Sequence, residues 1–108
     1  MSRSPNRRAA QVFFALADET RLSVLVKLRS SALSATALAA GTAVTRQAVM
    51  RHLKVLDGAG LVTHERRGRE VLYMPHGQGL REASAYLAMI SAGWDRAIGR
   101  LKDLVEKP

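Results

Sequence analysis

The stretch TRQAVMRHLKVLDGAGLV, residues 45–62, restricts the fold of this chain more than any other segment. On a helix, which turns about 100° per residue, Val49, Leu53 and Leu56 fall within one narrow sector. The opposite sector carries long polar side chains and one methionine, so one side can pack while the other stays accessible. The segment therefore predicts an amphipathic helix with two different surfaces.

Two glycines, Gly58 and Gly60, follow this pattern, and glycine readily takes the left-handed conformation that ends helices. The next segment, 61–75, reads LVTHERRGREVLYMP. It has two runs rich in β-branched and aromatic residues around a basic turn that contains Gly68. This pattern predicts a β-hairpin with a cationic tip.

Two further helices are expected before residue 30. Residues 1–6 are expected to form a short, mobile, basic arm, and apolar residues at helical spacing predict a helix from about residue 7 to residue 17. Asp18 can cap a second helix. The residues expected to form the buried stripe of that helix are Leu22, Leu25 and Leu28, with Val24 beside them.

The order of these elements predicts the fold class. Ser34 can begin a short third helix, and Thr45 can cap the amphipathic helix. Five helices with a hairpin before the last one make a mainly α fold, the winged helix-turn-helix. We expect one domain over residues 7–105, with the helix-turn-helix at 34–58, the wing at 61–75 and a dimerisation helix at 79–105.

The terminal helix carries an unbroken apolar seam. Its residues alternate spacings of three and four, as in a coiled coil: Leu80, Ala83, Leu87, Ile90, Trp94, Ala97, Leu101 and Leu104. A small domain can cover only part of such a seam, although its first turns could pack within one subunit. We expect a homodimer, and the predicted interface residues are Phe13, Leu87, Ile90, Trp94, Ala97, Leu101 and Leu104. The small residues Ala88, Ser91, Ala92 and Gly93 would allow close helix approach or leave room for a small apolar inducer.

The charge balance narrows the class of partner. Seventeen Lys and Arg against nine Asp and Glu give a formal net charge of +8, which favours nucleic acid and, as a lesser alternative, an anionic membrane surface. The absence of cysteine excludes disulfides and thiolate metal sites. No signal sequence or membrane-spanning run is present, so a cytoplasmic protein without a membrane partner is expected.

The accessible side of the amphipathic helix suits double-stranded DNA. Arginine can fork onto guanine, glutamine onto adenine, and methionine can pack on a thymine methyl group. The residues expected to face bases are Arg46, Gln47, Met50 and Arg51. Those expected at phosphates or the minor groove are Thr45, His52, Lys54, Arg66, Arg67 and Arg69. A solvated amphipathic helix and a solvated arginine-rich turn remain alternatives, and a boundary packing role for His52 is equally open.

Three segments carry a family resemblance: LADETRLSVLVKL (16–28), TRQAVMRHLKVLDGAGLV (45–62) and RRGREVLYMP (66–75). Together they resemble the ArsR family of winged-helix bacterial repressors over roughly residues 10–105. The resemblance implies a homodimer that binds operator DNA and represses transcription, usually until an inducer releases it. The chain departs from the family pattern at Thr42 and Ala43, where Leu and Gly are usual, and at Met50, where a small residue is common.

No metal site of the family's usual kind is expected. The third helical segment offers no ligand, and the last helix has carboxylates but no histidine. His52, His64 and His76 are not paired at helical spacing, whereas zinc needs three or four converging ligands. No nucleophile–base pair or phosphate-binding loop is seen, so neither a cofactor nor an enzyme is expected. The alternatives left open are a winged-helix protein-interaction module with only non-specific DNA affinity, and a repressor that responds to a metal or small ligand.

Overall fold

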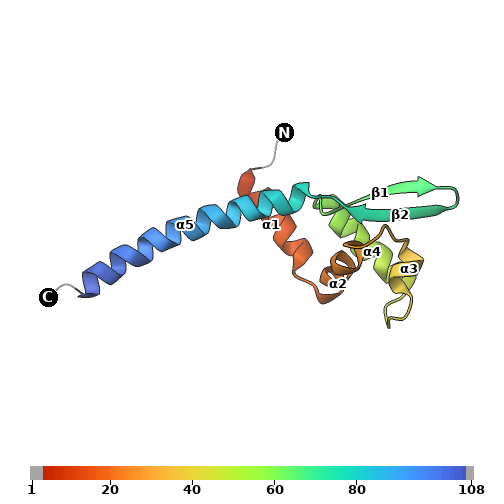
Figure 1. The fold of residues 1–108 in the computed structure, drawn as a ribbon, viewed down its shortest axis with the longest axis horizontal. Helices are drawn as coiled ribbons and strands as arrows, with labels where there is room; N and C mark the ends of the chain where they lie inside the picture. Colours follow the sequence, from red (N-terminus) through yellow and green to blue (C-terminus); the bar gives the residue numbers. More distant parts are fainter. Residues whose placement is uncertain (1–3, 107–108) are drawn as a thin grey trace.

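The computed structural model describes residues 4–106 and confirms the predicted fold class, a winged helix-turn-helix with five helices and a two-stranded antiparallel hairpin (Figure 1). In chain order the elements are α1 (Pro5–Leu16), α2 (Glu19–Leu28), α3 (Ala35–Ala39), α4 (Arg46–Gly58), β1 (Val62–Arg67), β2 (Glu70–Pro75) and α5 (Gln78–Glu106). The first four helices and the hairpin form a compact body, and α5 projects away from it (Figure 1). The molecule is consequently elongated, with extents of 70 × 36 × 21 Å.

Helix α1 begins earlier than the sequence pattern suggested. The Ser4 side chain caps it by accepting the Arg7 backbone N–H at 3.2 Å, and Pro5 occupies the first turn, where its missing N–H costs nothing. The expectation of a mobile arm up to residue 6 is therefore wrong for Pro5 and Asn6, which are helical, and for Ser4, which caps the helix. Residues 1–3 of that expected arm lie outside the described part of the chain.

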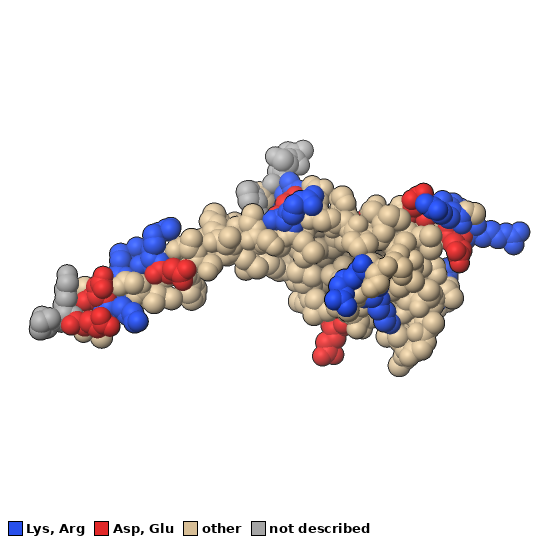
Figure 2. All heavy atoms as spheres, viewed as in Figure 1, with Lys and Arg blue, Asp and Glu red and all other residues tan. Residues whose placement is uncertain are grey.

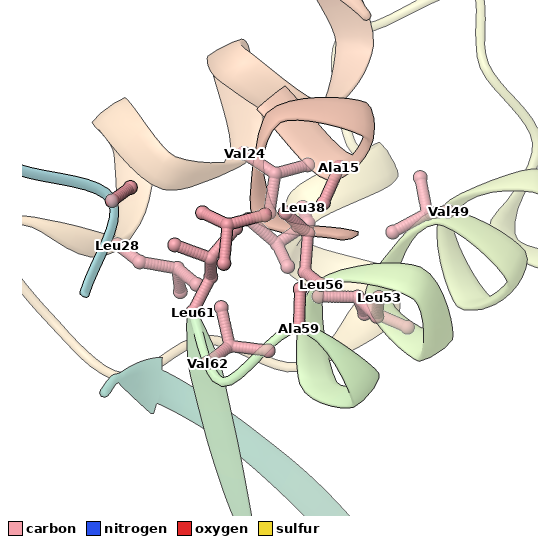
Figure 3. Packing of buried hydrophobic residues seen from close by; sticks show 13 residues of the cluster. Ala15, Val24, Leu28, Leu38, Val49, Leu53, Leu56, Ala59, Leu61 and Val62 are labelled. Carbon is pink, nitrogen blue, oxygen red and sulfur yellow. The ribbon is translucent and has the colours of Figure 1, made fainter. Parts of the chain in front are cut away.

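The core forms where α1, α2, α3 and α4 meet the start of the hairpin (Figure 3). Val49, Leu53 and Leu56 are buried there, as the periodicity of α4 predicted. Each such side chain contributes about 1.5–3 kcal/mol on leaving water. This apolar contact anchors α4 by one face and leaves the opposite face outside.

The buried stripe of α2 differs from the expected one. The buried residues are Arg21, Val24 and Leu28, whereas Leu22 is 46% exposed. The prediction was correct for Leu28 and wrong for Leu22. The buried stripe is rotated because the Arg21 guanidinium is buried against the body of the domain. The sequence pattern places such a charged group in solvent.

A single glycine supplies each of the sharp turns around α4. Gly41, before α4, has φ of 74°, and Gly60, after it, has φ of 73°. Gly58 instead remains helical, so of the two glycines expected to end α4 only Gly60 takes the left-handed conformation. Gly68, with φ of 62°, makes the turn of the hairpin.

The hairpin is tied to the helical body by a third short segment. Its strands pair antiparallel from Val62 opposite Pro75 to Arg67 opposite Glu70. Leu33, just before α3, adds a bridge to Tyr73, with backbone bonds of 3.1 Å and 2.8 Å. The base of the wing is therefore fixed while its tip extends freely (Figure 1).

Candidate nucleic-acid interface

The exposed face of α4 gathers the residues that the sequence assigned to bases. Arg46, Gln47, Met50 and Arg51 are all exposed, and Lys54 lies exposed one turn further along. Because the opposite face of this helix is fixed in the core, these side chains can approach a groove without unpacking the domain. The arrangement offers long donors and one thioether on a rigid helix.

The start of α4 is held by Thr45. Its hydroxyl oxygen accepts the Ala48 backbone N–H at 3.1 Å, which satisfies one of the helix's unpaired donors. Thr45 is exposed, and its hydroxyl can donate a hydrogen bond while it accepts this one. The first turn of α4 also contains no acidic residue, so nothing there opposes the approach of a phosphate.

The wing tip presents the three predicted arginines. Arg66 donates from Nε to the Gly68 carbonyl at 3.3 Å, and Arg67 Nε lies 3.5 Å from Glu65 Oε1. Arg69 is exposed at the turn. Figure 2 shows basic side chains reaching past the tip of the hairpin, with acidic ones beside them. Glu65, which sequence reasoning had not considered, partly neutralises this cluster.

His52 lies apart from the exposed face of α4. Its side chain is 23% exposed, and its Nδ1 is 3.2 Å from Nη1 of Arg21 and 3.9 Å from Oδ1 of Asp18. Of the two roles that the sequence left open, the geometry is that of a boundary residue in an internal polar contact. Arg21 was not among the predicted site residues, because its burial depends on bonds to the Ala15 and Phe14 carbonyls of α1 and not on a local pattern.

The other two histidines do not build a metal site. His64 Nδ1 pairs with Asp57 Oδ2 at 2.7 Å, and its ring stacks at a tilt on Tyr73. His76 lies 3.4 Å from the Gln78 side chain. Within residues 4–106, no three histidine, aspartate or glutamate side chains converge as metal ligands would.

A polar hollow of about 330 Å³ lies where α1, the end of α4 and the start of α5 meet. Its charged groups are already paired within the protein: Arg8 with Glu82, and Asp57 with His64. Glu82 also accepts a hydrogen bond from Gln78 at 3.2 Å. These contacts join α1 to α5 and α4 to the wing.

The predicted dimerisation residues on α5 are mostly open. The side chains exposed along its seam are Leu87, Ile90, Trp94, Leu101 and Leu104, and Ala97 is half-buried. Residues 83–94 carry no charge, and Figure 2 shows this stretch as an uncharged span between the body and the far end of the helix. Phe13 is half-buried against the core, whereas its neighbour Phe14 is 65% exposed.

No helix in the described part of the chain combines the length and apolar character needed to cross a bilayer.

Comparison with known proteins matches residues 16–65 to the family model described as a helix-turn-helix domain. The HTH-type transcriptional repressor SmtB of Mycobacterium tuberculosis is 42% identical over 65 residues, covering 60% of this chain and 48% of that protein. The match thus spans about half the length of that relative. The HTH-type transcriptional regulator Rv2034 of the same species is 34% identical over 104 residues, covering 96% of this chain and 91% of that one.

A solved structure shows the same likeness along nearly the whole chain. An ArsR-like transcriptional regulator from Rhodococcus sp. RHA1 superposes with a TM-score of 0.86 at 38% identity, covering 98% of this chain and 97% of that one. The similarity therefore includes the hairpin and the long terminal helix as well as the helix-turn-helix.

Proposed function

Because this chain belongs to the ArsR family of helix-turn-helix transcriptional regulators, we propose that it is a sequence-specific DNA-binding regulator, acting as a homodimeric repressor. The observation that carries the proposal is the division of α4 into two faces. Val49, Leu53 and Leu56 fix one face in the core, and the long donors of the other face are exposed. The wing adds arginines that project beyond the body.

In this proposal, α4 lies in the major groove. Arg46 and Arg51 would fork onto guanine edges, Gln47 onto adenine, and Met50 would pack on a thymine methyl group. Thr45 and Lys54 would meet phosphates, while Arg66, Arg67 and Arg69 of the wing would meet phosphates or the adjacent minor groove. His52 is left out of this set because its ring nitrogen faces Arg21.

The dimer would form through α5, and the exposed ring of Phe14 on α1 could add to the apolar contact. An exposed apolar seam on a helix that carries no charge from residue 83 to residue 94 suits a second copy better than solvent. A two-fold axis would set two α4 helices into major grooves about 34 Å apart. The preferred duplex would then be pseudo-palindromic.

The test is selection of duplexes from a randomised pool, followed by fluorescence anisotropy with the selected duplex and a scrambled version across a salt series. Enrichment of a pseudo-palindrome bound at least about a hundredfold more tightly than the scrambled duplex supports the proposal, since specific binders show about 10³–10⁷-fold preference. Equal affinities that fall together as salt rises would contradict it. They would favour an interaction module with a charged surface.

Release by a small-molecule inducer remains a prediction from the family. It is tested by titrating candidate metals and metabolites into the preformed complex and following the anisotropy of the duplex. Loss of binding at a ligand concentration that leaves the helix content unchanged would identify an inducer.

A further inference from the structure

Arg21 is the one charged residue that is buried within the described chain, at 8% exposure. Its Nε donates to the Ala15 carbonyl at 2.7 Å, and its Nη2 donates to the Phe14 carbonyl at 2.9 Å. Both carbonyls lie in the last turn of α1, where a cation is favoured by the helix dipole. The Phe14 ring lies 5.3 Å from the guanidinium carbon, within the range of a cation–π contact.

The remaining nitrogen of the guanidinium reaches the reading helix. Arg21 Nη1 lies 3.2 Å from Nδ1 of His52, which is at the middle of α4. One planar group on α2 therefore holds the end of α1 and the middle of α4 at once. The buried apolar stripe anchors α4 on the body, and this polar contact lies beside that stripe.

We propose that Arg21 positions the DNA-reading helix through His52, and that this link holds only while the His52 imidazole is neutral. The inference rests on the proposed function, since it concerns how α4 is presented to DNA. Guanidinium can only donate, so Nδ1 of His52 must accept and the ring hydrogen must sit on Nε2. Protonation converts Nδ1 into a donor, removes the bond and sets two cations against each other at a half-buried position.

Asp18 is the other ionisable group that faces His52. Its Oδ1 lies 3.9 Å from His52 Nδ1 but is already bonded to the Arg21 backbone N–H at 3.0 Å. This backbone bond, more than the nearby charges, lowers the pKa of Asp18, so its carboxylate is ionised at both pH values of the test below. A protonated His52 would therefore be repelled by Arg21 and drawn toward Asp18, which changes the position of the ring.

The remaining charged groups on elements around α4 are engaged elsewhere or exposed. Arg8 on α1 pairs with Glu82, and His64 on β1 pairs with Asp57 at the far end of α4. Glu19 and Lys27 on α2 are exposed, as are Arg46, Arg51 and Lys54 on α4 itself, and α3 has no ionisable residue. We therefore attribute any change of this contact with pH to His52.

The test compares three variants with the unaltered protein. His52→Asn keeps an acceptor oxygen close to the position of Nδ1 and cannot be protonated in the working range. His52→Ala leaves Arg21 Nη1 without this acceptor. His76→Asn is the matched control, because His76 is exposed and contacts Gln78 rather than Arg21. The readout is the ratio of affinities for the pool-selected duplex and its scrambled version, at about pH 7.5 and about pH 5.5.

The ratio of the unaltered protein should fall about tenfold at the lower pH, the scale of one hydrogen bond to a charged group. His76→Asn should behave the same way, and His52→Asn should change less than about twofold. For His52→Ala, the affinity ratio should already be low at the higher pH and should not change at the lower pH. Equal pH responses of the unaltered protein and His52→Asn would overturn the proposal. Equal affinity ratios for His52→Ala and His52→Asn at the higher pH would also overturn it. A loss of affinity for both duplexes in His52→Asn would overturn it as well, because it would mean that His52 contacts phosphate.

A second measurement needs no DNA and separates this inference from the proposed function. Amide hydrogen exchange of the free protein gives protection factors along α4 at both pH values. Protection around His52 should drop at the lower pH in the unaltered protein and persist in His52→Asn. If no duplex is selected but this difference is seen, the link stands and the proposed function fails. If a duplex is selected but protection is identical in both proteins, the link fails alone.

Discussion

The backbone N–H of Gly79, in the first turn of α5, donates to the carbonyl of Gly60 at 2.9 Å, directly after the reading helix. A second bond runs from the His76 N–H to the Leu61 carbonyl at 3.0 Å. The long terminal helix therefore leaves the body at a point bonded to the end of α4. In a dimer built on α5, these contacts would transmit the geometry of the dimer axis to the spacing of the two reading helices.

Gly79→Ala should destabilise the protein because the approach of Gly79 to the end of α4 leaves no room for a side chain. An added Cβ would overlap the Ala59 carbonyl oxygen and stand 3.0 Å from that of Gly60. Overpacking of this kind costs about 1–3 kcal/mol. Urea unfolding at one protein concentration measures it. Gly99→Ala is the control: nothing lies within 4 Å, so helix propensity should give a gain of up to about 1 kcal/mol. A Gly79→Ala protein as stable as this control would contradict the close approach.

Leu53→Ala should change stability and Met50→Ala should change DNA recognition, although both residues are on α4. Leu53 is 0% exposed, and removing its side chain should cost about 2–5 kcal/mol of unfolding free energy. Met50 is 41% exposed, so its removal should leave stability nearly unchanged and alter the duplexes selected from a random pool. Thermal unfolding and duplex selection test the pair. A selected sequence unchanged in Met50→Ala would remove Met50 from the base-facing set.

Much of the fold follows from local pattern. The spacing of apolar residues predicted the buried face of α4, and the basic turn with Gly68 predicted the hairpin. The early start of α1 was also readable, because Ser4 before Pro5 is a local capping signal. Features that depend on contacts between segments distant in sequence could not be predicted from the local pattern. The bridge of Leu33 to Tyr73 is one such contact, and neither residue carries a local sign of it.

Arg21 shows why the buried stripe of α2 could not be predicted. Leu22 and Leu25 fit helical spacing with Leu28, and a leucine stripe is the ordinary expectation. Arg21 takes the buried position because the carbonyls of Phe14 and Ala15 at the end of α1 need hydrogen-bond donors. These carbonyls face α2 only after folding. The exposed face of α4, by contrast, was predictable because it depends on the helix's own period.

Arg67→Ala should weaken binding to all duplexes and reduce the slope of log affinity against log salt by about one, as expected for one lost phosphate contact. Arg67 is exposed at the wing, with Glu65 at 3.5 Å as its partner. Arg100→Ala removes the same charge from exposed α5 and should leave the slope unchanged. Anisotropy titrations at several salt concentrations measure both. Equal slopes for the two variants would mean that the wing tip remains in solvent.

Asp18→Asn should reduce the dependence of stability on acid pH. The pKa of Asp18 is lowered from 3.8, first by the hydrogen bond from the Arg21 backbone N–H. The unfolded chain then binds this proton more readily, so the stabilisation is present above about pH 4 and is lost as pH falls through the folded pKa. Urea midpoints between about pH 3 and pH 7 should fall less in Asp18→Asn than in the unaltered protein. Parallel curves would show that this carboxylate does not contribute.

Trp94→Ala should separate dimerisation from folding. Trp94 is 66% exposed on the α5 seam, and the buried residues of α5, Gly79 and Ala83, lie nearer its start, so removal of the Trp94 side chain should leave unfolding of the body nearly intact. A buried tryptophan at an interface typically contributes about 2–4 kcal/mol, so the dimer Kd should rise at least about thirtyfold. Sedimentation velocity across a concentration series measures this Kd. Asp95→Ala, next to it but off the seam, is the control and should sediment like the unaltered protein.

Since two half-sites must be bound together, Trp94→Ala should also bind the selected pseudo-palindrome weakly and a single half-site normally. An unchanged Kd would mean that the seam does not form the dimer.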